Sequence, residues 1–143
     1  MKLLLPLFIV IAALCGGGCE MKTTPLGLRV EFKPDSESKM QHALVPFLLQ
    51  RGFKRTSPIF FMIPDSPKMS PRISAYFTGD ITHPGFTVGK ITSSFTAEEV
   101  QLMDQCVVFM IDHSDSIVSG RLVDRATSPS VRERFYARIK KSE

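Results

Sequence analysis

The stretch Phe95 to Val100, "FTAEEV", fixes the start of one helix. The Thr96 side chain is placed to accept a hydrogen bond from the backbone N–H of Glu99, and the Glu99 carboxylate is placed to accept one from the N–H of Thr96. Phe95 and Val100 occupy the positions of a hydrophobic staple across the same start. Apolar residues then recur at helical spacing, namely Val100, Met103, Val107 and Met110, with Cys106 and Ile111 widening the stripe. The pattern predicts a helix over 97–112 with one face packed against the rest of the chain.

Other segments alternate with the period of two that is typical of strands. In "LRVEFK", Leu28, Val30 and Phe32 alternate with charged residues. Residues 57–64, 72–79 and 86–95 are the other expected strands. A bulge at Gly89 in the last of them would bring its apolar residues to one face. The pattern of residues 117–123, "IVSGRLV", is ambiguous between a strand and a short helix.

Two further helices are expected. Residues 40–52 have helical spacing, with Pro46 predicted to kink or split the helix and Gly52 to end it. "SPSVRERFYARIKK" begins with Ser128 as the cap and Pro129 at the first helical position. Val131, Phe135 and Ile139 lie along one face of this C-terminal helix. We expect that face to dock on the domain.

The element order is β-α-β-β-β-α plus the C-terminal helix, which predicts an α+β fold with a small antiparallel or mixed four-stranded sheet and helices on one face. Residues 28–143 are expected to form a single domain, because the chain of 143 residues has the length of one domain. The formal charge of +4 falls to +3 without residues 1–18, which contain Lys2 and no acid. This excess is too small to favour nucleic acid as a partner.

The chain starts with a positive residue and an apolar run. Lys2 is followed by twelve apolar residues, Leu3 to Leu14, and then by "CGGGCE". Twelve residues span ~18 Å as a helix, which is short of the ~30 Å hydrocarbon core of a bilayer. The layout predicts a secretory signal peptide over 1–18 rather than a membrane span.

Gly17 and Gly18 before Cys19 resemble the cleavage site of a bacterial lipoprotein signal peptide, although Gly16 stands where that family usually has an aliphatic residue. The resemblance implies that Cys15 is removed, that Cys19 is lipidated, and that 19–27 forms the lipidated N-terminus and tether. It also implies an outer membrane location facing the periplasm, because Glu20 is not the aspartate that tends to retain lipoproteins in the inner membrane. Ordinary signal cleavage with release of the chain is the alternative.

Catalytic chemistry has little support in the sequence. Cys106 and His113 are seven residues apart on one helix, a rise of ~10.5 Å, so they cannot form a nucleophile–base pair. Cys106 is interpreted as a core residue, and without Cys15 and Cys19 it has no disulfide partner. Asp112, His113, Asp115 and His83 lack the spacing of a known metal motif, so we expect no metal, no cofactor and no catalytic residues.

The resulting hypothesis is a non-catalytic interaction or structural module of the bacterial cell envelope, held at the membrane by its lipid and bound to an unidentified envelope protein. Two alternatives are an exported hydrolase-like enzyme that uses His83 or His113, and a small subunit of a secretion or conjugation apparatus. The residues for lipid or partner contact are the basic ones of the C-terminal helix: Arg132, Arg134, Arg138, Lys140 and Lys141. A solvated helix face is the simpler interpretation of these five.

Overall fold

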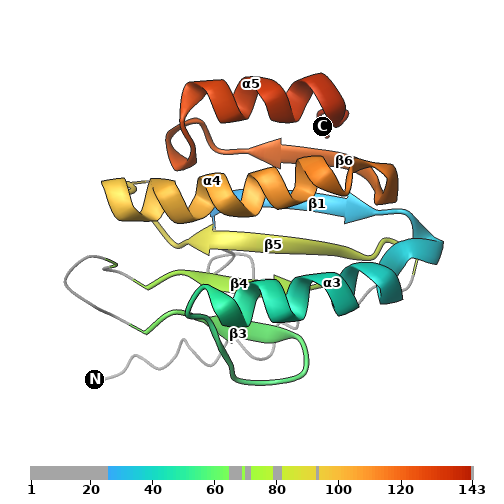
Figure 1. The fold of residues 1–143 in the computed structure, drawn as a ribbon, viewed down its shortest axis with the longest axis horizontal. Coiled ribbons are helices and arrows are strands. Elements are labelled where there is room, and N and C mark those ends of the chain that lie inside the picture. The colour runs from blue at the N-terminus through green and yellow to red at the C-terminus, as the bar shows by residue number, and fades with distance from the viewer. Residues whose placement is uncertain (1–25, 65–68, 70–71, 79–81, 93, 143) are drawn as a thin grey trace, which may run out of the picture.

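The computed structural model describes residues 26–64, 69, 72–78, 82–92 and 94–142. The expected signal peptide, Cys19 and most of the tether lie outside them. The described residues form one six-stranded sheet in the order β2-β3-β4-β5-β1-β6, and all neighbouring strands are antiparallel (Figure 1). The strands are β1 (Leu26–Phe32), β2 (Lys54–Arg55), β3 (Phe60–Met62), β4 (Ser74–Phe77), β5 (Gly85–Lys90) and β6 (Ile117–Leu122).

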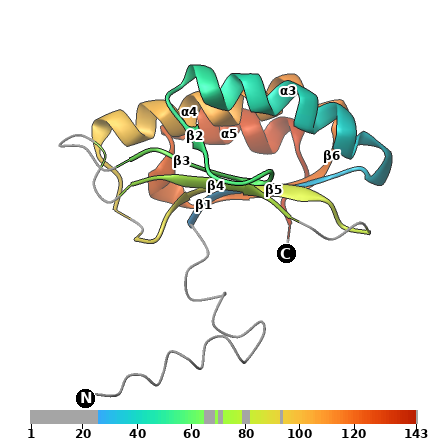
Figure 2. The ribbon, with the colours of Figure 1, turned by 90° about the horizontal axis from the view of Figure 1, so that it is seen from below.

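The α-helices of the described chain are α3 (Glu37–Gln50), α4 (Ala97–Asp112) and α5 (Pro129–Arg138). Short 3-10 helices follow β1 at Pro34–Ser36 (η2), α4 at Ser114–Ser116 (η3) and β6 at Asp124–Ala126 (η4). All three α-helices lie on the same face of the sheet (Figure 2). The expected α+β class with helices on one face is therefore confirmed.

The core fills the space between the sheet and the helices. Leu28, Val30 and Phe32 are buried, as their alternation in the sequence predicts. From α4, Met103 and Val107 are fully buried against the sheet. Burial of a side chain of this size contributes ~1.5 to 3 kcal/mol to stability, so the apolar faces of β1 and α4 hold the two layers together.

The prediction of four strands is wrong, because the sheet has two more. Residues 117–122 form β6, whose ambiguous pattern is resolved by antiparallel pairing with β1, as at Val30 with Gly120. The other addition, β2, consists of two exposed residues, Lys54 and Arg55, and has no apolar pattern by which the sequence would reveal it. Short charged strands are common at sheet edges, where they discourage pairing with another chain.

The predicted bulge at Gly89 is also wrong. β5 pairs regularly on both sides, with Gly89 opposite Gly27 and Ser74. A side chain at Gly89 would collide with the backbone of Leu26, so close backbone approach explains this glycine.

Two predictions concern the continuity and the end of α3. The helix is not split at Pro46, which lies inside a continuous Glu37–Gln50. Its end is as predicted, because Gly52 has a φ of 95° just after the last helical turn. Glycine adopts this left-handed conformation without the steric cost that a side chain imposes.

Candidate functional site on the open face of the sheet

None of the described helices covers the second face of the sheet, which we call the open face (Figure 2). Side chains alternate between the two faces of a strand, so the neighbours of core residues point to the open face. The strand register aligns one such residue from each of five strands. This cross-strand row consists of Phe60, Tyr76, Thr87, Arg29 and Arg121, on β3, β4, β5, β1 and β6 respectively.

The first half of the cross-strand row is aromatic. The rings of Phe60 and Tyr76 are parallel within 3°, with centroids 6.0 Å apart. Both residues are half-buried and belong to no part of the hydrophobic core, whereas their neighbours Phe61 and Phe77 are buried in it. Half-exposed Phe60 and Tyr76 therefore present an apolar patch on the open face.

The second half of the row is basic. Arg29 and Arg121 are directly opposite each other on β1 and β6, and both are exposed. Opposite residues of antiparallel strands have Cβ atoms ~4.5 to 5.5 Å apart, and like charges at this distance destabilise the pairing. Within the part of the chain that the structure describes, neither guanidinium forms an ion pair. The two charges are therefore available to an anion.

Thr87 joins the two halves at the centre of the row. It is 1% exposed, and its hydroxyl oxygen has no hydrogen-bond partner among the described residues. A buried hydroxyl without a partner costs ~1 to 3 kcal/mol. Thr87 therefore places a buried hydroxyl without a described partner at the centre of the row.

A hollow of about 200 Å³ lies beside Arg29, and the polar residues that line it are Arg29, Glu31, Thr78, His83, Ser119 and Ser142. The Nδ1 atom of His83 is 3.1 Å from the Glu31 carboxylate. A carboxylate that accepts a hydrogen bond from Nδ1 leaves Nε2 as the acceptor nitrogen of a neutral imidazole. His83 is thus the histidine that the structure brings to a carboxylate.

The other two histidines bond to their own helices. His42 Nδ1 lies 2.9 Å from the carbonyl of Ser38, and His113 Nδ1 lies 2.8 Å from that of Phe109. The His113 ring also stacks on Phe109 with centroids 4.1 Å apart. These contacts give His113 a structural role at the end of α4.

Cys106 lies in the core, as the helical pattern predicts. Burial raises the pKa of its thiol to about 12, and the nearby charge of Arg51 lowers it by a smaller amount. At neutral pH the thiol is therefore protonated. A thiol in this state is neither a nucleophile nor a metal ligand.

Three of the five predicted contact residues, Arg132, Arg134 and Arg138, are on α5, whereas Lys140 and Lys141 follow the helix, which ends at Arg138 and not beyond it as predicted. α5 belongs to the helical layer, beside β6 (Figures 1 and 2). The Arg132 guanidinium donates a hydrogen bond of 2.8 Å to the carbonyl of Asp124, and the Lys141 ammonium lies 5.6 Å from the centre of the Tyr136 ring. The remaining basic residues of this group are exposed: Arg134, Arg138 and Lys140.

Sequence reasoning missed the cross-strand row. Arg29 is recognisable in the sequence only as a polar residue of an alternating strand. Arg121 lies in a segment of ambiguous structure. The alternation of each strand shows which residues face away from the core. It identifies a row across the sheet only when the strand order and register are known.

No family model, curated protein or solved structure matches this chain. None of the described helices has the length and apolar character needed to cross a bilayer. Among the described residues there is also no cluster of three His, Cys, Asp or Glu placed to hold a metal ion. The assignment of the candidate site therefore rests on the geometry of this chain and not on a relative.

Proposed function

We propose that this protein is a lipid-anchored, non-catalytic interaction module of the bacterial envelope, located at the periplasmic side of the outer membrane, and that the open face is its interaction surface. The pattern of residues 1–19 supports export and lipidation of Cys19. The cross-strand row is the observation that carries the interaction role. Its aromatic pair and its unpaired arginines lie on a face that no described helix covers.

The composition of the row is typical of binding surfaces. Tyrosine and arginine are enriched among the residues that contribute most to protein interfaces. The adjacent positive charges of Arg29 and Arg121 weaken strand pairing in the free protein. An anionic partner would neutralise this repulsion. The free energy of binding would therefore include the relief of the repulsion between the two arginines.

Two measurements test the proposal. Mass spectrometry of the mature N-terminus should find acylated Cys19 and no Cys15. A photo-crosslinking amino acid at Tyr76 in cells should capture an envelope component, whereas the same group at Leu49, 47% exposed on α3, should not. An unmodified N-terminus would contradict the lipid anchor. Equal capture at both positions would contradict the role of the open face as the interaction surface.

The contact between His83 and Glu31 favours a second candidate, an exported hydrolase that uses His83 as its base. Ser119 and Ser142 also line the hollow around this pair. In that case His83→Ala should lower hydrolysis of an activated ester by about 10²-fold or more, and His42→Ala should not. Equal background rates in wild type and both variants would exclude this candidate.

A further inference from the structure

We propose that the open face docks on the anionic headgroups of the membrane that carries the lipid anchor, with Arg29 and Arg121 as the phosphate-binding pair. This inference rests on the proposed function, because it names the partner of the open face. Adjacent guanidinium groups match the oxygen atoms of phosphate in both charge and hydrogen-bond geometry.

The charge of the open face fits an anionic surface. Besides Arg29 and Arg121, the exposed Lys54 belongs to this face, because it pairs with Met62, whose neighbour Phe61 points to the core. The acid at the same face is Glu31, and its carboxylate is 3.1 Å from His83.

The spacing of these charges favours a membrane over a compact ligand. Lys54 is on β2 at one edge of the sheet, and Arg121 is on β6 at the other. Five strand intervals of ~4.8 Å separate these edges, which gives a width of roughly 24 Å. A headgroup layer offers phosphates across this entire width, whereas a small anion reaches only one end of it.

The aromatic pair lies between these basic residues. Phe60 and Tyr76 are on β3 and β4, and Met62 on β3 is also half-buried. Tyrosine is enriched at the level of lipid headgroups, where its ring contacts apolar chains and its hydroxyl remains hydrated. The open face thus combines an aromatic pair on β3 and β4 with basic residues on β2, β1 and β6, and interfacial membrane-binding surfaces combine apolar and basic residues in the same way.

The expected anchor keeps this face close to the bilayer. Seven residue steps separate Cys19 from Leu26, the first residue of β1, and seven residues reach at most ~25 Å. A domain held this close to the surface has a high effective concentration of headgroups. Weak individual contacts from Arg29, Lys54 and Arg121 then become sufficient for docking.

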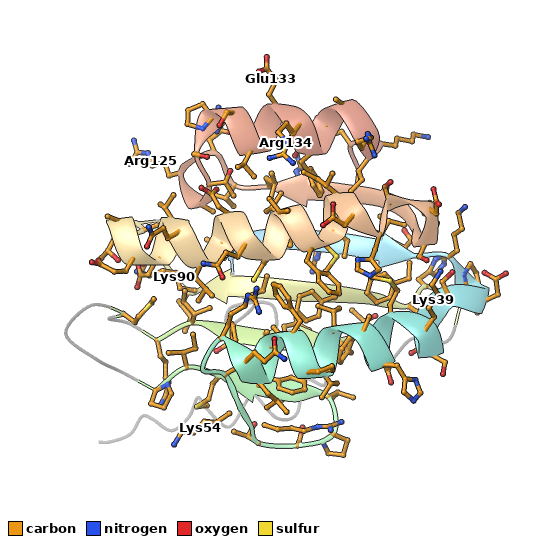
Figure 3. The ribbon with its side chains drawn as sticks, viewed as in Figure 1. Lys39, Lys54, Lys90, Arg125, Glu133 and Arg134 are labelled. Carbon is orange, nitrogen blue, oxygen red and sulfur yellow. The ribbon has the colours of Figure 1, made fainter. Side chains whose placement is uncertain are left out.

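The basic group on α5 is the competing membrane surface. Arg134 and Arg138 are exposed there, but the exposed acid Glu133 is on the same helix, and Arg132 is bonded to Asp124 (Figure 3). In Figure 3 Lys54 lies in the lower part of the view and Arg134 lies by α5 in the upper part. A double substitution on α5 is therefore a matched control for one on the open face.

The test uses the acylated protein in vesicles of phosphatidylcholine, alone or mixed with phosphatidylglycerol. A fluorophore is attached through Ser119→Cys on the open face or Glu133→Cys on α5, and quenching by headgroup-labelled lipid is measured. Native Cys106 is buried and does not compete for the label. We expect quenching at position 119 with phosphatidylglycerol at low salt, loss of it at high salt, and little quenching at position 133.

Charge reversal then identifies the residues. Each basic side chain at an anionic surface contributes about a fivefold factor in binding, so Arg29→Glu with Arg121→Glu should lower the ratio of docked to undocked protein at least ~25-fold. Arg134→Glu with Arg138→Glu changes the net charge equally and should have little effect. Circular dichroism confirms that both variants are folded.

Three results would overturn the inference: equal quenching at positions 119 and 133, equal losses in the two double variants, or quenching that does not depend on phosphatidylglycerol. Photo-crosslinking from Tyr76 to a protein without lipid adducts would also overturn it, while leaving the interaction function intact. Mass spectrometry of the N-terminus tests the anchor separately. Failure of the inference and failure of the proposed function are therefore distinguishable.

Discussion

At the level of single residues, Glu99 takes part both in the N-terminal cap of α4 and in a buried ion pair. Its backbone N–H donates to the Thr96 hydroxyl at 3.2 Å, and its carboxylate accepts from the Thr96 N–H at 2.7 Å, which completes the predicted capping box. The same carboxylate oxygen lies 2.6 Å from the ammonium of Lys90, and both side chains are buried. This buried ion pair joins the start of α4 to the end of β5.

Thr96→Ala should destabilise the domain by ~1 kcal/mol, because it removes the side-chain half of the capping box. Ser128→Ala is the matched control, since Ser128 is the N-cap of α5 but its side chain makes no cap hydrogen bond. Denaturant melts of both variants give the comparison. A loss at Ser128 as large as that at Thr96 would contradict the importance of the cap.

Lys90→Met should cost ~3 kcal/mol or more, because it leaves the Glu99 carboxylate buried without its cation. Adding Glu99→Leu should recover part of this loss, since an apolar pair has no uncompensated charge. The double variant still lacks one half of the capping box, so recovery should be incomplete. Strictly additive losses in a double-mutant cycle would mean that the two side chains are not coupled.

The pKa of about 12 for Cys106 predicts a pH dependence of stability. Above its ordinary pKa of 9.0 the thiol ionises in the unfolded chain but not in the folded one, so the stability that it contributes is present below pH 9 and is lost between 9 and about 12. From about pH 7 to about pH 10 the wild type should lose ~1 kcal/mol more than Cys106→Ala. The measurement is the free energy of unfolding of both proteins as a function of pH. The same pH dependence in wild type and Cys106→Ala would contradict burial of the thiol.

At the scale of elements, the C-terminal segment protects an edge of the sheet. Two backbone N–H groups of β6 form hydrogen bonds with this segment. The N–H of Gly120 donates to the carbonyl of Lys140, and the N–H of Leu122 donates to the hydroxyl of Tyr136. The three predicted apolar residues are buried, although only Val131 and Phe135 are on α5 and Ile139 directly follows the helix. α5 and the residues after it therefore satisfy backbone groups that an edge strand otherwise exposes.

Tyr136→Phe should destabilise the domain by ~1 kcal/mol, because the N–H of Leu122 loses its acceptor. Hydrogen exchange at Leu122 should accelerate more than exchange at Arg29, which lies in the interior strand β1. Tyr76→Phe is the control, since no hydrogen bond of its hydroxyl occurs among the contacts of the described chain. Unchanged exchange at Leu122 would mean that water replaces the hydroxyl.

At the scale of the whole molecule, the two faces of the sheet have different roles. The helical face carries the core, and its aromatic residues Phe77 and Phe86 pack with centroids 5.3 Å apart. The open face carries the cross-strand row, whose arginines repel each other. Substitutions on the helical face should therefore act mainly on stability, and those on the open face mainly on binding.

Arg121→Glu separates the two effects within one substitution. It replaces a like-charge pair with an opposite-charge pair next to Arg29, so the free domain should gain ~0.5 kcal/mol in stability. Docking on anionic vesicles should weaken at the same time, because a basic contact becomes an acidic one. Arg125→Glu is the control, since Arg125 is exposed in η4 and not in the sheet. A variant that is less stable than wild type would contradict the repulsion.

The elements that could be predicted from the amino-acid sequence are those with short-range signals. The capping box at Thr96, the alternation of Leu28, Val30 and Phe32, and the glycine stop at Gly52 each depend on residues within one turn or one strand. Short-range sterics and hydrogen bonds decide such features before any distant segment is in place. The α+β class follows from these elements and their order.

The strand order, the edge strands β2 and β6, and the composition of the open face depend on contacts between segments that are distant in the sequence. Lys54 and Arg55 become a strand because β3 offers them a partner, and Gly89 is glycine because the backbone of Leu26 is close to it. The cross-strand row joins residues 29, 60, 76, 87 and 121 through register alone. Register depends on the simultaneous pairing of all the strands, and a pattern in one strand contains no information about its partners.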